Sequence, residues 1–313
     1  MMAIDTPNPR EAYGLALVEL GRRDRNVVAL EADLGLSTRS VLFGKEFPDR
    51  YFQMGIAEQD MASTAAGLAL AGKIPFVHSF AVFAAGRAYD QLRNAICIPG
   101  LRVRVCGSSA GLSDFGDGKT HQSVEDMAIM RALPKMTVLS PADAVELVKM
   151  MEGLSEIDGP VYLRVNRNDA IALVPRGERW TRGRIWELRQ GKDVAVFANG
   201  VLVSRALAAA ERLAREGVDV KVLNVSTVKP IDRDAVIAHA RGMKGIVVAE
   251  EGTVVGGLGS AVLEALRRER HAPVELVGIA DRFGMSARGY DELLQAYGLT
   301  SEGVEAAIRS LIG

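Results

Sequence analysis

The chain has 313 residues, of which 48% are hydrophobic and 25% are charged, and its formal net charge is −1. This length predicts about two domains of roughly 150 residues each, and the near-neutral charge argues against a nucleic-acid partner. The start of the chain lacks the apolar core of a signal peptide, and no apolar run reaches the roughly 18 residues of a membrane span, so we expect a cytoplasmic protein without membrane contact.

Short β-branched segments alternate with alanine- and leucine-rich segments throughout the chain. In the first half the strand-like segments are 27–30, 51–54, 74–77, 102–105 and 161–165. A second alternating series begins at 193–198 and continues through 218–225 and 245–251, after a charged linker at 175–192 that contains Gly and Pro. The pattern predicts an α/β fold with two doubly wound, mostly parallel-sheet domains, residues 1–180 and 190–313. The two cysteines, Cys97 and Cys106, are too few for a disulfide framework and are expected to be buried.

Ligands of open α/β sheets bind beyond the carboxyl ends of the strands. Three loops of the first half follow predicted strands and carry polar or aromatic side chains. The first loop contains Glu58 at the start of a small-residue helix, where the helix dipole alone would explain an acidic residue. The second carries Phe80 and Phe83, which are spaced to share one face and are also compatible with plain core packing.

The third loop, residues 108–122, lies in a stretch with four glycines between positions 107 and 118, so its backbone can approach a ligand closely. Asp117 and His121 flank Gly-Lys-Thr there, and histidine can shuttle protons near neutral pH. Gly-Asp-Gly at 116–118 resembles the start of a known metal-binding motif that continues with an asparagine roughly thirty residues later. No asparagine lies there in this chain, so we expect no metal on it.

The segment GIAEQDM, followed by AAGLALAGKIPFVHSFAVFAAGRAYDQLR, resembles the pyrimidine-binding domain of transketolases. This resemblance implies thiamine diphosphate as cofactor, with Glu58 contacting N1′ of the aminopyrimidine ring and promoting proton loss from the thiazolium carbon. It implies that Phe80, and less firmly Phe83, pack against that ring. The role of His78, beside this site, stays open.

The segment DGKTHQ resembles the DGPTHQ segment with which transketolases contact sugar hydroxyls. The resemblance therefore implies that Asp117 and His121 bind substrate, and that His121 is a second catalytic residue. Many relatives carry histidine where this chain has Ser109.

Transketolases hold a sugar phosphate with arginines and a serine, and the alignment around Ala32-Asp33-Leu34 assigns these roles to Arg10, Ser37 and Arg167. Arginine suits phosphate because its planar fork donates two charge-assisted hydrogen bonds. Arg164 is the alternative to Arg167.

The second half carries VVAEEGTVVGGLGSAVLEAL and DRFGMSARGYDELLQAYGLT, which resemble the C-terminal domain of transketolases and deoxyxylulose-phosphate synthases. Its GGLGSA does not match the dinucleotide fingerprint, because the third glycine is missing. We expect subunit contacts and no active-site residue in this half.

The resemblance covers two of the three transketolase domains and lacks the diphosphate-binding one. It implies an N-terminal transketolase subunit as partner, which binds the cofactor diphosphate and Mg²⁺ or Ca²⁺, in an α2β2 assembly that transfers a two-carbon ketol unit between sugar phosphates. Three alternatives stay open: the β subunit of a 2-oxoacid dehydrogenase, a deoxyxylulose-phosphate synthase-like enzyme, and a scaffold without catalysis.

Overall fold

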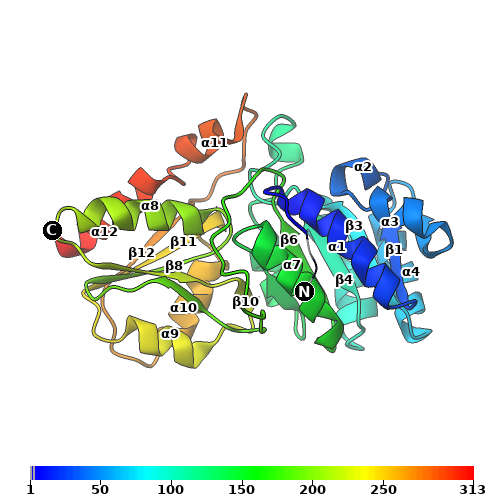
Figure 1. Cartoon of the computed structure of the whole chain (residues 1–313), viewed down its shortest axis with the longest axis horizontal. Helices are drawn as coiled ribbons and strands as arrows, with labels where there is room; N and C mark the ends of the chain where they lie inside the picture. The colour runs from blue at the N-terminus through cyan, green and yellow to red at the C-terminus, as the bar shows by residue number, and fades with distance from the viewer. Residues whose placement is uncertain (1, 3) are drawn as a thin grey trace.

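The computed structural model describes residue 2 and residues 4–313. Two layered α/β units, each built on its own sheet, lie side by side (Figure 1). Strands within each sheet are mostly parallel, and apolar clusters cover both faces of the first sheet. The predicted α/β fold class is confirmed.

The first sheet has seven strands in the order β10-β5-β6-β4-β3-β1-β2, all parallel to their neighbours except β10, which runs antiparallel to β5. Its strands are β1 (Val27–Glu31), β2 (Tyr51–Gln53), β3 (Ile74–Phe80), β4 (Arg104–Ser108), β5 (Thr137–Leu139), β6 (Val161–Val165) and β10 (Thr227–Lys229). The α-helices of this half are α1 (Pro9–Arg23), α2 (Gly35–Thr38), α3 (Val41–Glu46), α4 (Glu58–Leu70), α5 (Tyr89–Gln91), α6 (Asp126–Ala132) and α7 (Ala144–Gly153). Two π-helical turns, η2 (Val82–Arg87) and η3 (Leu92–Cys97), flank α5, and 3₁₀ turns lie at Pro48–Arg50, Gly118–Thr120 and Leu154–Glu156.

The second sheet has five strands in the order β12-β11-β8-β9-β7, with β7 antiparallel at its edge. Its strands are β7 (Trp186–Arg189), β8 (Val194–Ala198), β9 (Val220–Asn224), β11 (Gly245–Thr253) and β12 (Val274–Ile279). Its helices are α8 (Leu202–Ala214), α9 (Arg233–Ala240), α10 (Leu258–Leu266), α11 (Tyr290–Ala296) and α12 (Ser301–Ile312).

The strand segments named from the sequence are all strands in the structure, although the one predicted at 102–105 begins only at Arg104. Four strands, β5, β7, β10 and β12, were not predicted. Both cysteines are buried and free, as expected, and burial raises the pKa of Cys97 to about 11 and that of Cys106 to about 12. Across the residues that the structure describes, no helix is both long and apolar enough to cross a bilayer.

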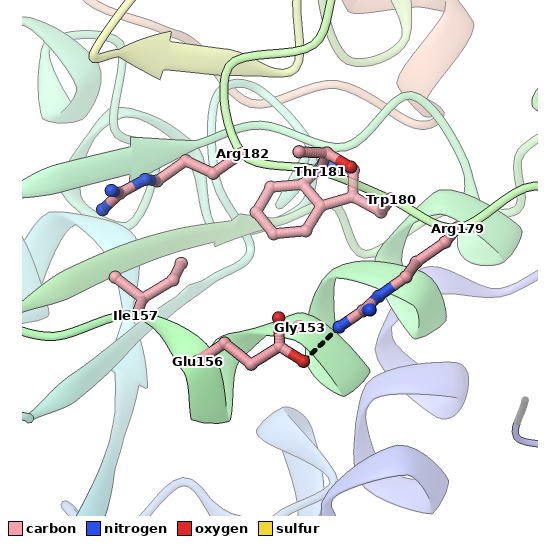
Figure 2. Close-up of a pocket in the computed structure, with 7 residues that line it drawn as sticks. All are labelled: Gly153, Glu156, Ile157, Arg179, Trp180, Thr181 and Arg182. Atoms are coloured by element: carbon pink, nitrogen blue, oxygen red, sulfur yellow. Dashed lines mark hydrogen bonds and ion pairs between the residues drawn. The ribbon is translucent and has the colours of Figure 1, made fainter.

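The segment between β6 and β7 contains no helix or strand and packs its tryptophan onto α7. A Cβ atom on Gly153 would lie 2.8 Å from Cε3 of Trp180, so the indole rests directly on the helix backbone. A hollow of about 360 Å³ lies beside this contact, and Arg179 forms an ion pair with Glu156 across its rim (Figure 2). Some of the residues that line it lie at and just after the end of α7, and the others belong to the connecting segment. None of them is a predicted site residue.

The two halves are also joined directly. Strand β10 pairs with β5, and the backbone N–H of Ser140 donates to the carbonyl of Ser226 (2.8 Å). Glu146 on α7 is fully buried and accepts from the side chain of Asn224 on β9 (2.9 Å). The second half therefore packs against the β5 edge of the first sheet and against the start of α7.

Candidate active site

Glu58 is the first residue of α4, yet only 1% of its side chain is exposed. Acidic side chains in a first helical turn are ordinarily solvated, so the helix dipole does not account for its burial. Ser79 on β3 donates to Oε1 (3.2 Å) and Arg87 donates to Oε2 (3.1 Å). These two donors compensate the loss of water around the buried carboxylate.

Aromatic rings line the space near this carboxylate. The rings of Phe80 and Phe83 lie nearly parallel, with centroids 6.3 Å apart and an interplanar angle of 17°. The His121 ring meets both edge-on, at 6.1 Å from Phe80 and 5.4 Å from Phe83. The three rings, of Phe80, Phe83 and His121, form an aromatic wall. The guanidinium of Arg87 lies over the Phe83 ring at 5.1 Å, so Arg87 contacts both this wall and Glu58. The structure thus brings the three predicted loops together.

The turn that carries Arg87 is π-helical, and single π turns are frequent at functional sites. Its wider winding follows the end of β3 at Phe80 and runs over the small, buried Ala84 and Ala85. Neither Ser79 nor Arg87 was predicted as a site residue. The residue composition of this turn gives no sign of where a π-helical winding would aim the arginine.

In the third loop, Asp117 is exposed and precedes a 3₁₀ turn at Gly118–Thr120. His121 is partly buried, and its Nδ1 lies 3.0 Å from the Thr120 hydroxyl. Ser109 is fully buried with a φ of 53°, so it shapes the turn of the loop. Of the two predicted polar residues of this loop, His121 is the one whose ring packs against Phe80 and Phe83.

The second half supports this loop. The Gln122 side chain donates to the carbonyls of Asp114 (3.0 Å) and Met285 (2.9 Å). Gly118 has a φ of +74°, and a Cβ atom there would lie 2.3 Å from the hydroxyl of Ser286. The segment around Met285 therefore fixes the loop that carries Asp117 and His121, although no site residue was expected from this half.

His78 is buried on the other face of β3 from Ser79. Its Nε2 lies 2.7 Å from the Tyr13 hydroxyl and its Nδ1 lies 2.8 Å from the carbonyl of Leu30. Burial lowers the pKa of His78 to about 4. The histidine is therefore a neutral residue that joins α1 to the first sheet, which answers the question left open by the sequence.

Arg10 and Ser37 lie next to each other, since Arg10 Nη1 donates to the Ser37 carbonyl (3.1 Å). Burial, followed by repulsion from Arg167 and Arg39, lowers the pKa of Arg10. The three arginines therefore gather at one place, although Arg39 was not predicted. Arg164 lies elsewhere, in a buried ion pair with Asp126 (2.9 Å), and does not replace Arg167.

Asn8 ties this arginine cluster together. Its Oδ1 accepts from the backbone N–H of Glu11 and so caps α1, while its Nδ2 donates to the carbonyl of Arg167 (3.1 Å). Asn8 before Pro9 is a typical helix-start sequence, and it could have been recognised as a cap. Its second contact, 159 residues away along the chain, has no signature in the sequence.

At the glycine-rich start of α10, the side chain of Glu250 takes up the free backbone N–H groups. Both oxygens of Glu250 accept backbone N–H groups, from Leu258 (2.8 Å) and Gly259 (2.9 Å). A carboxylate at this position fills the place where a dinucleotide phosphate would bind. The structure agrees with the rejection of a dinucleotide fingerprint.

Comparison with known proteins identifies both halves. Residues 5–171 match the family model "Transketolase, pyrimidine binding domain" and residues 183–304 match "Transketolase, C-terminal domain". A 6-deoxy-6-sulfo-D-fructose transketolase subunit from Clostridium sp. is 40% identical, covering 95% of this chain and 92% of the relative. A putative transketolase C-terminal section from Methanocaldococcus jannaschii is also 40% identical, covering 96% and 94%.

A solved structure described as a split gene transketolase, an inactive beta4 tetramer, shares 44% identity and a TM-score of 0.87, covering 97% of each chain. Human transketolase is 36% identical over 97% of this chain, which spans 49% of the human protein. The chain belongs to the transketolase family, of which it carries the pyrimidine-binding and C-terminal domains.

Proposed function

We propose that this chain is the smaller subunit of a split, thiamine-diphosphate-dependent transketolase that acts in the cytoplasm on ketose and aldose phosphates. The observation that carries this proposal is the buried Glu58 carboxylate beside the aromatic wall of Phe80, Phe83 and His121. The split relatives of nearly equal length support a subunit that works with a second chain.

The residues present fit the pyrimidine half of thiamine diphosphate. Glu58 offers a carboxylate shielded from water, and Phe80 and Phe83 offer flat apolar surfaces for an aromatic ring. When bound, thiamine diphosphate supplies the carbon nucleophile and electron sink that cleavage of a carbon–carbon bond next to a carbonyl requires. The diphosphate and its Mg²⁺ or Ca²⁺ belong, in this proposal, to an N-terminal transketolase subunit in an α2β2 assembly.

Each residue of this chain then has a task in the reaction. Glu58 holds a proton at N1′ of the ring, which is the general acid–base contribution of this subunit. The aromatic wall excludes water from the reacting carbon. His121, with Asp117, binds sugar hydroxyls near the reacting carbonyl, and His121 can move a proton there.

The arginine cluster lies at the start of α1 and binds the far end of the substrate. Arg10, Ser37 and Arg167 hold the terminal phosphate by charge-assisted hydrogen bonds. Anchoring the far end fixes the position of the carbonyl, and binding energy from a remote group contributes in this way to the rate.

The test compares the chain alone with the chain mixed with its N-terminal partner. We expect the isolated chain to be inactive and to bind thiamine diphosphate weakly, and the mixture to transfer ketol units from a ketose phosphate or hydroxypyruvate. Micromolar, magnesium-dependent binding by the isolated chain in calorimetry would contradict the division of the cofactor site. Turnover of pyruvate in place of ketoses would favour a 2-oxoacid dehydrogenase or a deoxyxylulose-phosphate synthase-like enzyme.

A further inference from the structure

The three clustered arginines, Arg10, Arg39 and Arg167, differ in their charge partners. Arg39 Nε lies 2.9 Å from a carboxylate oxygen of Glu11, and Arg167 Nη1 lies 2.6 Å from a carboxylate oxygen of Asp114. Arg10 donates to a carbonyl, and within the described part of the chain it has no ion pair and its buried Nε has no hydrogen-bond partner. The charges of Arg39 and Arg167 are therefore each paired with a carboxylate of this chain, and the charge of Arg10 is not.

Arg39 is held in place by the backbone. Its φ of 64° is a conformation that a bulky side chain adopts only when its surroundings impose it. A Cβ atom on Gly14 of α1 would lie 2.7 Å from the Arg39 Cβ, so this backbone is packed tightly against the helix that carries Glu11. The Arg39–Glu11 pair is consequently a fixed part of the cluster.

Asp114 is also fixed. Its side chain is 4% exposed, whereas that of Arg167 is 33% exposed, so the acid lies beneath the arginine and the arginine faces the solvent. The segment around Asp114 is held by the side chain of Gln122 and by Asn168, whose Nδ2 donates to the Ser113 carbonyl (3.0 Å). A buried carboxylate in this position is poorly screened by water and salt, and it offsets the charge of Arg167 for any ligand bound above it.

We infer that this cluster selects a substrate whose terminal group carries one negative charge, a sulfonate or a singly ionised phosphate, over a phosphate dianion. Asp114 is the positioning residue that sets this preference, through Arg167. The inference rests on the proposed function, since it concerns the far end of the ketose. A phosphate monoester loses its second proton near pH 6 and is mainly a dianion at pH 7.5, whereas a sulfonate keeps a single charge throughout.

The experiment uses the complex with its N-terminal partner and two donors, a ketohexose 6-phosphate and the 6-deoxy-6-sulfonate analogue of the same sugar. The measured quantity is the ratio of the two kcat/KM values, sulfonate over phosphate, at pH 5.5 and 7.5. Titrations of the enzyme act on both donors and cancel in this ratio. We expect the ratio to rise with pH in the unmodified protein as the phosphate becomes a dianion.

The variant Asp114→Asn should lower the ratio at pH 7.5 by roughly tenfold, because removing one fixed negative charge favours the dianion. The matched control, Asp291→Asn, breaks an exposed ion pair with Arg205 in the second half and should leave the ratio unchanged. Transfer from hydroxypyruvate to glycolaldehyde, which needs no terminal anion, reports whether each variant is folded and active.

The outcomes separate the two proposals. Loss of hydroxypyruvate transfer in the unmodified complex would contradict the proposed function itself. If hydroxypyruvate transfer is normal, two results would overturn the charge inference. One is a sulfonate-over-phosphate ratio that Asp114→Asn does not change, and the other is a ratio that falls as the pH rises in the unmodified protein. If the complex prefers the phosphate donor at pH 5.5 and the sulfonate donor at pH 7.5, the phosphate monoanion is the form that it recognises. If it prefers the sulfonate donor at both pH values, the sulfonate is the terminal group that the cluster fits.

Discussion

Glu58 has a position unusual for an acidic residue at a helix start, because it is buried and held by Ser79 and Arg87 from two other segments. A hydrogen bond to a charged group contributes about 1.5–3 kcal/mol. The two contacts therefore keep an ionisable side chain in a place shielded from water, where we propose that it meets a ring nitrogen of the cofactor.

The variant Glu58→Gln should leave the subunit folded and remove most activity of the complex. The amide has nearly the same shape but cannot exchange a proton with N1′ of the cofactor. Proton exchange at the thiazolium carbon, followed by NMR in the complex, should slow by about a hundredfold or more. An unchanged exchange rate would show that Glu58 has no such role, and Glu305→Gln on α12 is the control.

The residues that we propose as ligand contacts were easier to predict from the sequence than those that position them. Glu58, Phe80 and His121 lie in short segments whose resemblance to transketolases is visible in the sequence. Asp114 and Arg87 lie close to those segments as well, but their roles depend on contacts with residues 53 and 29 positions away. Such contacts are created by the fold, so the local sequence has no feature that distinguishes these two side chains.

At the scale of elements, glycines mark where helices approach other elements closely. In α1, a Cβ atom on Gly21 would lie 2.4 Å from the Phe43 ring and 2.7 Å from the Phe47 ring. In α4, a Cβ atom on Gly67 would meet nothing within 4 Å. The two positions have the same residue type in helices of similar length but opposite surroundings.

The variant Gly21→Ala should lower the free energy of unfolding by about 1–3 kcal/mol, since the added methyl group overpacks the contact between α1 and α3. Gly67→Ala should raise it by about 0.5–1 kcal/mol, because alanine restricts the unfolded chain and suits a helix. Urea unfolding of the isolated chain measures both. Equal stability of the two variants would contradict the close packing of α1.

The long strands of both sheets follow from their β-branched runs, whereas the short ones do not. Strands β5 and β10 have three residues each, too few to show a period, and β10 is defined only by pairing with β5 across 88 positions of the chain or more. Strand β12 is only partly buried and β7 is a short edge strand, so neither has the continuous apolar run of a central strand.

At the scale of the whole molecule, the junction between the halves contains a buried acid. Glu146 Oε2 accepts from the backbone N–H of Ala142 (2.8 Å) and from Asn224 (2.9 Å). Burial raises the pKa of Glu146 to about 7, against an ordinary value of 4.5. The folded protein thus binds a proton that the unfolded chain releases between these two values.

Because the folded state binds this extra proton, the Glu146 contribution to stability falls as the pH rises from about 4.5 to 7 and stays low above that. At about 1.4 kcal/mol per pKa unit, the cost above pH 7 is about 3 kcal/mol. Glu146→Gln should therefore stabilise the chain by about 2–3 kcal/mol at pH 8 and by much less at pH 5.

Urea unfolding at both pH values measures this difference, and Glu211→Gln, at an exposed position on α8, is the control. A Glu146→Gln variant that is less stable than the unmodified protein at pH 8 would show that the buried carboxylate is favourable when ionised. The hydrogen bonds from Ala142 and Asn224 would then outweigh its desolvation.

Strand β10 lies late in the chain and completes the first sheet beside β5. During synthesis on the ribosome, β5 and β6 emerge well before residue 227, so the edge of β5 stays open while β7, β8 and β9 are being made. An unpaired strand edge is a template for pairing with other chains. We expect nascent chains arrested before residue 227 to associate with one another or with chaperones, and the two halves of the protein to mature together as translation ends.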